Sequence, residues 1–124
     1  MFNDYESSGK HMICDFKNIE NIGLLNNINE LNLMLKDICC KHNFQILKET
    51  QYLFTPIGCS ILFLLSESHI SIHTFPEKNH MSFDIYTCRQ YKDNKDYLQI
   101  YNYLIDNLKA SKNNSKCQII DRYF

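Results

Sequence analysis

The sequence predicts an α+β fold: a two-layer sandwich with a mostly antiparallel sheet and two helices on one face. Three features of the chain lead to this prediction. Two segments place apolar residues at helical spacing, and several others alternate apolar with polar residues in the manner of half-buried strands. Short turns join most consecutive strand segments, so neighbouring strands must run mostly antiparallel.

The first half of the chain supplies a strand, a helix and a second strand. Residues 11–17 form a short predicted strand, and residues 28–42 form a predicted amphipathic helix. Residues 44–54 contain β-prone aromatic and aliphatic side chains, and Pro56 and Gly58 then mark a turn. The residues whose spacing predicts the helix are Ile28, Leu31, Leu35, Ile38 and Cys39.

The second half supplies three more strands, a helix and a closing strand. Residues 59–66 form an apolar run of strand length, and residues 69–75 and 81–88 alternate between apolar and polar side chains. Residues 94–109 form the second predicted helix, and residues 117–123 close the sheet. The predicted order is therefore β-α-β-β-β-β-α-β. We expect the sheet face without helices to be covered in another way or to form an interface.

Length and composition narrow the class of protein. The 124 residues fit one domain spanning residues 1–124, and 44% of them are hydrophobic, as in globular proteins. The net charge of −1 argues against a nucleic-acid binder, because such proteins usually carry a basic stripe. The N-terminal segment is polar and acidic, unlike a signal peptide, and no apolar run has bilayer-spanning length. We therefore expect a cytoplasmic protein without a membrane partner, with its six cysteines as free thiols.

The segment 65–77 is the most informative part of the chain, with two histidines, two acidic residues and three serines. A zinc site formed by His69 and His73 would require a helix, because four residues of strand separate them by about 13 Å. A serine hydrolase using Ser68 or Ser71 would lack the Gly-x-Ser-x-Gly turn that such enzymes use. A third interpretation is a structural edge strand whose polar face meets solvent, and composition alone favours it.

Four segments of the chain resemble one known family at matching separations. The segment 65–77 closely resembles the processing-site signature of the short prokaryotic S-adenosylmethionine decarboxylase proenzymes. Residues 8–11 resemble the Gly-basic-His opening of that family, and residues 54–60 resemble its Phe-x-Pro-x-Gly-x-Ser segment. Residues 83–88 resemble its downstream strand, which ends in Thr-Cys. The C-terminal third of the chain matches only in pattern.

The resemblance implies that the chain is a proenzyme that cuts itself. The hydroxyl of Ser68 would attack the carbonyl carbon of Glu67 in an N-to-O acyl shift, which turns the amide into an ester. A β-elimination would then separate residues 1–67 from residues 68–124 and convert Ser68 into a pyruvoyl group. This self-generated group is the implied cofactor, and the substrate amine would form a Schiff base with its carbonyl. No metal ion is implied.

The resemblance also implies a role for several other side chains. His73 would be the base that takes the α-proton in the elimination, and Ser60 would hydrogen-bond the tetrahedral intermediate. Cys88 would be the general acid that protonates the substrate carbon after carbon dioxide leaves. The residues implied to bind the substrate, by stacking on adenine and by accepting from the ribose hydroxyls, are Phe54, Phe75 and Glu77.

The implied activity is the decarboxylation of S-adenosylmethionine, which gives the aminopropyl donor for spermidine and other polyamines. The implied assembly is a homodimer of processed protomers, with part of the substrate pocket coming from the second subunit. Two alternatives stay open: a pyruvoyl-dependent decarboxylase of arginine or ornithine, and a non-catalytic homologue that acts as a binding partner. The family often has Trp at the position of Phe75, and this difference leaves the affinity for the substrate and its identity undetermined. The intact Glu67, Ser68, His73 and Cys88 argue against a non-catalytic protein.

Overall fold

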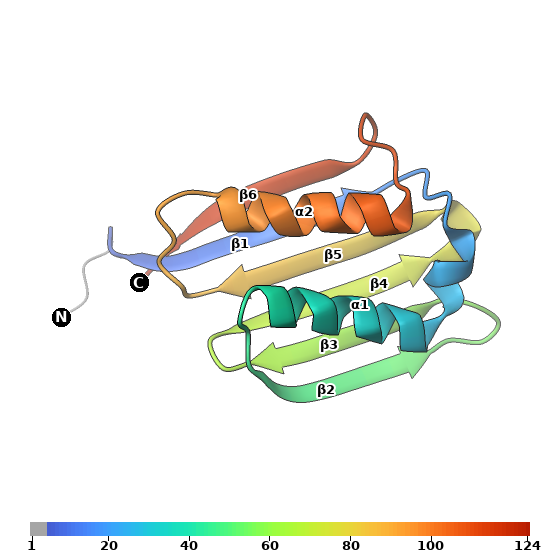
Figure 1. The fold of residues 1–124 in the computed structure, drawn as a ribbon, viewed down its shortest axis with the longest axis horizontal. Helices are drawn as coiled ribbons and strands as arrows, with labels where there is room; N and C mark the ends of the chain where they lie inside the picture. Colours follow the sequence, from blue (N-terminus) through green and yellow to red (C-terminus); the bar gives the residue numbers. More distant parts are fainter. Residues whose placement is uncertain (1–4) are drawn as a thin grey trace.

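Within residues 5–124, which the computed structural model describes, six strands form one antiparallel sheet and two helices cover one of its faces (Figure 1). The sheet order is β2-β3-β4-β5-β1-β6, so the first strand lies between the last two. Residues 1–4, the start of the polar N-terminal segment, lie outside the described range. This arrangement confirms the predicted sandwich and its chain order. The elements are β1 (Ser7–Phe16), η1 (Ile22–Asn26), α1 (Ile28–Lys41), β2 (Ile46–Leu53), β3 (Cys59–Leu65), β4 (Ser68–Phe75), η2 (Pro76–Lys78), β5 (His80–Thr87), α2 (Lys95–Leu108) and β6 (Lys116–Tyr123).

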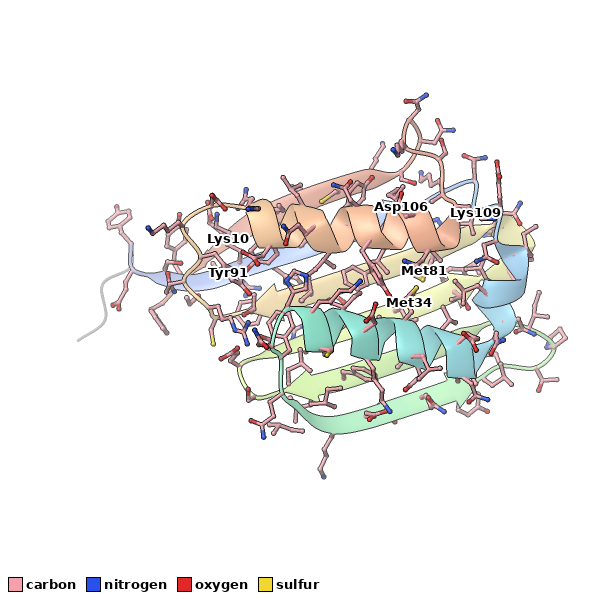
Figure 2. The ribbon with its side chains drawn as sticks, in the orientation of Figure 1. Lys10, Met34, Met81, Tyr91, Asp106 and Lys109 are labelled. Atoms are coloured by element: carbon pink, nitrogen blue, oxygen red, sulfur yellow. The ribbon has the colours of Figure 1, made fainter. Side chains whose placement is uncertain are left out.

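The core lies between the sheet and the two helices. Along β4 and β5 the predicted alternation is found, with buried apolar residues facing the helices and polar residues facing away. Met34 of α1 and Met81 of β5 are both buried, and Figure 2 places them in the space between the two helices as drawn. No helix of residues 5–124 has the length and hydropathy to span a bilayer. The buried helix residues are Leu31, Met34, Leu35, Ile38, Cys39, Tyr97, Ile100, Leu104, Ile105 and Leu108.

The strand β1 begins at Ser7, although the sequence pattern predicted a start at residue 11. The additional residues are paired, and Lys10 lies opposite Thr87 of β5. The register shifts between Ser7 and Gly9, where Gly9 has a φ of 107°, a conformation that favours glycine. Short polar residues around such a bulge carry no apolar alternation, so the sequence pattern did not reveal this part of the strand.

The sheet face opposite the helices is left open in the described part of the chain (Figure 1). Two leucines of β3 point outward on this open face, with Leu62 44% and Leu64 52% exposed. They line a groove of about 380 Å³, together with residues of β2 and β4 that include His69 and Ser71. A sheet face with exposed leucines beside polar groups has the composition of a contact surface. That it forms an interface stays a prediction.

Candidate active site

The peptide bond between Glu67 and Ser68 lies where the short turn from β3 enters β4. Ser68 is the first residue of β4 and lies opposite Thr87, the last residue of β5. Its side chain is 8% exposed, and its hydroxyl oxygen has no hydrogen-bond partner among the described residues. A buried hydroxyl without a partner is unusual, because most buried polar groups are hydrogen-bonded. The lone pairs of the Ser68 oxygen are therefore free for a chemical role.

The carbonyl oxygen of Glu67 receives two hydrogen bonds from Cys88. The backbone N–H of Cys88 donates to it at 3.1 Å, and the thiol donates at 3.1 Å. Two donors on one carbonyl oxygen polarise the carbon and stabilise negative charge on the oxygen, as in an oxyanion hole. The resemblance implies that Ser60 hydrogen-bonds the tetrahedral intermediate, which stays a prediction. The contact made by Cys88 was not identified from the sequence.

Arg89 anchors the side chain of Glu67, a contact that the sequence analysis did not identify. Its Nε forms an ion pair with the Glu67 carboxylate, and its terminal nitrogens donate to the carbonyls of His42 and Asn43. Its guanidinium also lies 4.3 Å from the ring centroid of Phe44. Arg89 therefore ties the β3–β4 turn to the loop between α1 and β2.

Gly9 explains how β1 passes close to Cys88. A Cβ atom added at Gly9 would lie 2.0 Å from the carbonyl oxygen of Thr87 and 2.6 Å from the Cα of Cys88. Any larger residue would push the end of β5 away, and the positive φ of Gly9 adds to the strain. Gly9 thus allows β1 to pack directly against the backbone of Thr87 and Cys88.

A second group of predicted site residues lies at the other end of β4. Ser60 and His73 face each other across β3 and β4, and the Ser60 hydroxyl lies 2.6 Å from His73 Nδ1. Three predicted substrate residues belong to this end: Phe54 follows β2, Phe75 ends β4, and Glu77 lies in η2. Phe54 and Phe75 are both partly exposed, so their rings are available to a ligand.

The structure does not bring Ser68 and His73 together within one chain. Five residues of extended strand separate them by about 17 Å. An odd interval also places them on opposite faces of the sheet: Ser68 points toward the helices and His73 toward the open face. Figure 1 shows the two ends of β4 at opposite sides of the molecule. The predicted site residues therefore fall into two separate groups.

A third cluster lies on the open face between these groups. Nε2 of His11 is 2.6 Å and Nε2 of His69 is 3.4 Å from Oδ2 of Asp84, and the Ser71 hydroxyl donates to Oδ1. Burial raises the pKa of Asp84, but the hydrogen bonds from Ser71 and His11 outweigh it and hold this pKa below its ordinary value.

This cluster is the one group in the described chain whose spacing would suit a metal ion, since its three ligand atoms lie within 4.8 Å of one another. Arg122 Nη1, however, lies 3.3 Å from His11 Nδ1 and can only donate. It makes Nδ1 the acceptor and leaves Nε2 as the donor to Asp84, so that nitrogen already has a partner. The pair formed by His69 and His73 lies along one strand and cannot share an ion.

Comparisons with known proteins agree with the resemblance. The sequence model of a family described as S-adenosylmethionine decarboxylase matches residues 10–122. A Bacillus cereus protein named S-adenosylmethionine decarboxylase proenzyme 2 is 38% identical over 85 residues, which is 68% of each chain. A Brevibacillus brevis protein named S-adenosylmethionine decarboxylase proenzyme is 32% identical over 113 residues, or 91% of this chain and 82% of the relative. The crystal structure of the Aquifex aeolicus adenosylmethionine decarboxylase superposes with a TM-score of 0.82 at 24% identity, covering 96% of this chain and 93% of the other.

Proposed function

Because the chain belongs to the S-adenosylmethionine decarboxylase family, we propose that it cuts itself between Glu67 and Ser68 and then decarboxylates S-adenosylmethionine. One observation carries the proposal: the Ser68 hydroxyl is buried without a partner, and the carbonyl of the preceding residue, Glu67, accepts two hydrogen bonds from Cys88. A nucleophile beside an activated carbonyl is what an acyl shift requires. The product would serve as an aminopropyl donor for spermidine synthesis.

Self-cleavage begins with the bond between Ser68 and Glu67. The Ser68 oxygen attacks the Glu67 carbonyl carbon, and the two Cys88 donors stabilise the negative charge on the oxygen. The C–N bond then breaks, the nitrogen of Ser68 takes a proton, and an ester remains. A base removes the α-proton of Ser68, the Glu67 carboxylate leaves, and hydrolysis of the resulting dehydroalanine releases ammonia. The chain is then two fragments, residues 1–67 and 68–124.

The base for this elimination is proposed to come from a second copy of the chain. His73 of the same chain lies about 17 Å along β4 from Ser68, too far for a direct proton transfer. In a two-fold dimer each contact occurs twice, so His73 of each subunit can serve Ser68 of the other. The open face, with Leu62 and Leu64 exposed beside a polar cluster, supports such a contact. The Ser60 hydroxyl, 2.6 Å from His73 Nδ1, orients its ring.

The substrate pocket is proposed to lie between the two subunits. The rings of Phe54 and Phe75 would stack on adenine and attract the sulfonium cation, and Glu77 would accept from the ribose hydroxyls. A pyruvoyl group at position 68 would supply an electron-accepting carbonyl for the substrate amine. Cys88, already adjacent to position 68, then donates a proton to that carbon. The family match supports this substrate over arginine or ornithine.

The test combines mass and activity. Purified protein is expected to consist of two fragments, with the one beginning at residue 68 resistant to Edman sequencing, and Ser68→Ala is expected to stay one chain. The processed protein should release labelled carbon dioxide from carboxyl-labelled S-adenosylmethionine and not from arginine or ornithine run in parallel. A wild-type chain that stays intact after long incubation would contradict the self-cleavage. Release only from arginine or ornithine would overturn the substrate assignment.

A further inference from the structure

Two cysteines on neighbouring strands lie directly opposite each other. Cys14 of β1 is paired with Cys117 of β6 in the antiparallel register. Both side chains point to the helix-covered face, where Cys14 is 1% exposed and Cys117 is partly buried against the core. Directly opposite residues on one face have Cβ atoms about 4.5–5.5 Å apart, close to the roughly 3.5–4.5 Å of a disulfide. The backbone therefore holds the two thiols near bonding geometry.

The two thiols differ in exposure and in the direction in which their pKa values are shifted. A hydrogen bond from Cys14 lowers the pKa of the Cys117 thiol, and the same contact, with burial, raises the pKa of Cys14. Cys117 also lies on β6, one of the two edge strands of the sheet, whereas Cys14 lies on the neighbouring inner strand β1. An oxidant from solvent thus reaches first the sulfur with the greater thiolate character.

The other cysteines of the described chain are not arranged in this way. Cys39 and Cys40 are consecutive in α1, one buried and one exposed, so their side chains diverge. Cys59 lies opposite Leu53, and Cys88 follows the end of β5. Among the strand pairs of residues 5–124, only Cys14 and Cys117 are cysteines that lie opposite each other.

We propose that Cys14 and Cys117 are a redox pair that peroxide closes into a disulfide between β1 and β6. The Cys117 thiolate attacks one peroxide oxygen, the O–O bond breaks, and hydroxide leaves and is protonated to water. Cys117 is then a sulfenic acid. The Cys14 sulfur attacks the Cys117 sulfur, the S–O bond breaks, and a second water leaves with the thiol proton. Two thiols and one hydrogen peroxide give one disulfide and two waters, and a dithiol reductant reverses the bond.

The bond has a particular consequence if the chain cuts itself, and this part rests on the proposed function. Cys14 belongs to residues 1–67 and Cys117 to residues 68–124, so the disulfide joins two fragments that are otherwise associated without a covalent bond. The pair faces the helices, so it lies away from the open face on which a second copy is proposed to dock. Formation of this disulfide would therefore link the two fragments of each protomer covalently without rearranging the subunit contact.

The test is oxidation of the purified protein by equimolar hydrogen peroxide, followed by thiol blocking and a non-reducing gel. The processed wild type is expected to migrate as one species with the combined mass of both fragments and to separate after reduction. Peptide mapping should find Cys14 linked to Cys117. Cys117→Ser and Cys14→Ser should stay as two fragments, whereas Cys40→Ser, which removes an exposed cysteine of α1, should behave as the wild type.

The uncut Ser68→Ala chain separates this inference from the proposed function. After the same oxidation it is expected to lose the mass of two hydrogens and to show the same linked peptides, whether or not the wild type cuts itself. Cys117→Ser in this background should keep its mass apart from oxygen additions. Free Cys14 and Cys117 in both proteins after oxidation, or a link mapped to another pair, would overturn the inference.

Discussion

The backbone N–H and the thiol of Cys88 both lie 3.1 Å from the carbonyl oxygen of Glu67. The residue implied as the proton donor of decarboxylation thus contacts the peptide bond that is proposed to be cut. Cleavage would turn that carbonyl into a carboxylate that can move away and release the thiol. One side chain would then serve two successive reactions.

Substitutions of Cys88 should separate its two roles. Cys88→Ala keeps the backbone donor and loses the thiol donor, so self-cleavage should slow at least about tenfold. Cys88→Ser keeps a donor and should cut itself near the wild-type rate, but it should lose most decarboxylation because an alcohol is a much weaker acid than a thiol. Time courses of fragment formation and release of labelled carbon dioxide measure the two effects. Wild-type turnover in Cys88→Ser would remove Cys88 from the proton transfer.

The separation of Ser68 from His73 predicts complementation between two inactive chains. His73→Ala alone should stall as an ester that hydroxylamine cleaves, and Ser68→Ala alone should stay uncut. Co-expressed at equal levels, they should form mixed dimers, so that up to about half of the His73→Ala chains are cut. Mass spectrometry of the co-purified chains gives the cut fraction.

The matched control for this experiment replaces the helper chain with the Ser68→Ala, His73→Ala double variant. That helper has no histidine at position 73, so the His73→Ala chain should stay uncut in dimers with it. Normal cleavage of His73→Ala by itself would show that His73 is not the base. Absence of rescue in mixed dimers would instead place the base in the same chain as the Ser68 it serves.

Arg89 is predicted to position the scissile bond. Arg89→Met removes the ion pair with Glu67 and the donors to His42 and Asn43, so the turn should lose its anchor. We expect self-cleavage to slow roughly tenfold, equivalent to about 1.4 kcal/mol. Glu67→Gln, which removes the charge and keeps the size, should slow it less. Cleavage of Arg89→Met at the wild-type rate, in a protein with an unchanged circular dichroism spectrum, would argue against a positioning role.

Asp84 makes stability depend on acid pH. Its pKa is lowered in the folded protein, because hydrogen bonds from Ser71 and His11 outweigh burial. A carboxyl with a lowered folded pKa stabilises the fold above its unfolded pKa, and this contribution is lost as pH falls through the folded pKa. Asp84→Asn should therefore be destabilised at pH about 7, with a difference from wild type that shrinks below pH about 4.

Urea unfolding of both proteins across this pH range measures the effect of Asp84. Asp106→Asn is the control, because Asp106 lies exposed on α2 (Figure 2) and should show no such convergence. A stability difference for Asp84→Asn that is constant from neutral to acid pH would contradict the assigned role of its charge.

Local patterns predicted the elements well and the distant contacts poorly. The alternation in residues 69–75 and 81–88 identified both strands and their buried faces, because side-chain direction depends only on neighbouring residues. The anchoring of Glu67 by Arg89 depends on which strand ends meet, and sequence spacing does not encode that. The separation of Ser68 from His73 could have been predicted from the sequence, because residues five positions apart on a strand point to opposite faces of the sheet. The Leu-Ser-Glu-Ser-His resemblance assigned roles to both residues without placing them in space.

The sheet order β2-β3-β4-β5-β1-β6 interleaves the two products of self-cleavage. The first product, residues 1–67, would contain β1, β2 and β3. The second product would contain β4, β5 and β6, and β1 of the first would lie between β5 and β6 of the second. Before the cut, all strands are tethered and find each other at high effective concentration. After it, a denatured molecule would have to thread one chain between two strands of another in a bimolecular encounter. The cut protein would then keep the fold that formed before cleavage, and its lifetime would depend on its rate of unfolding.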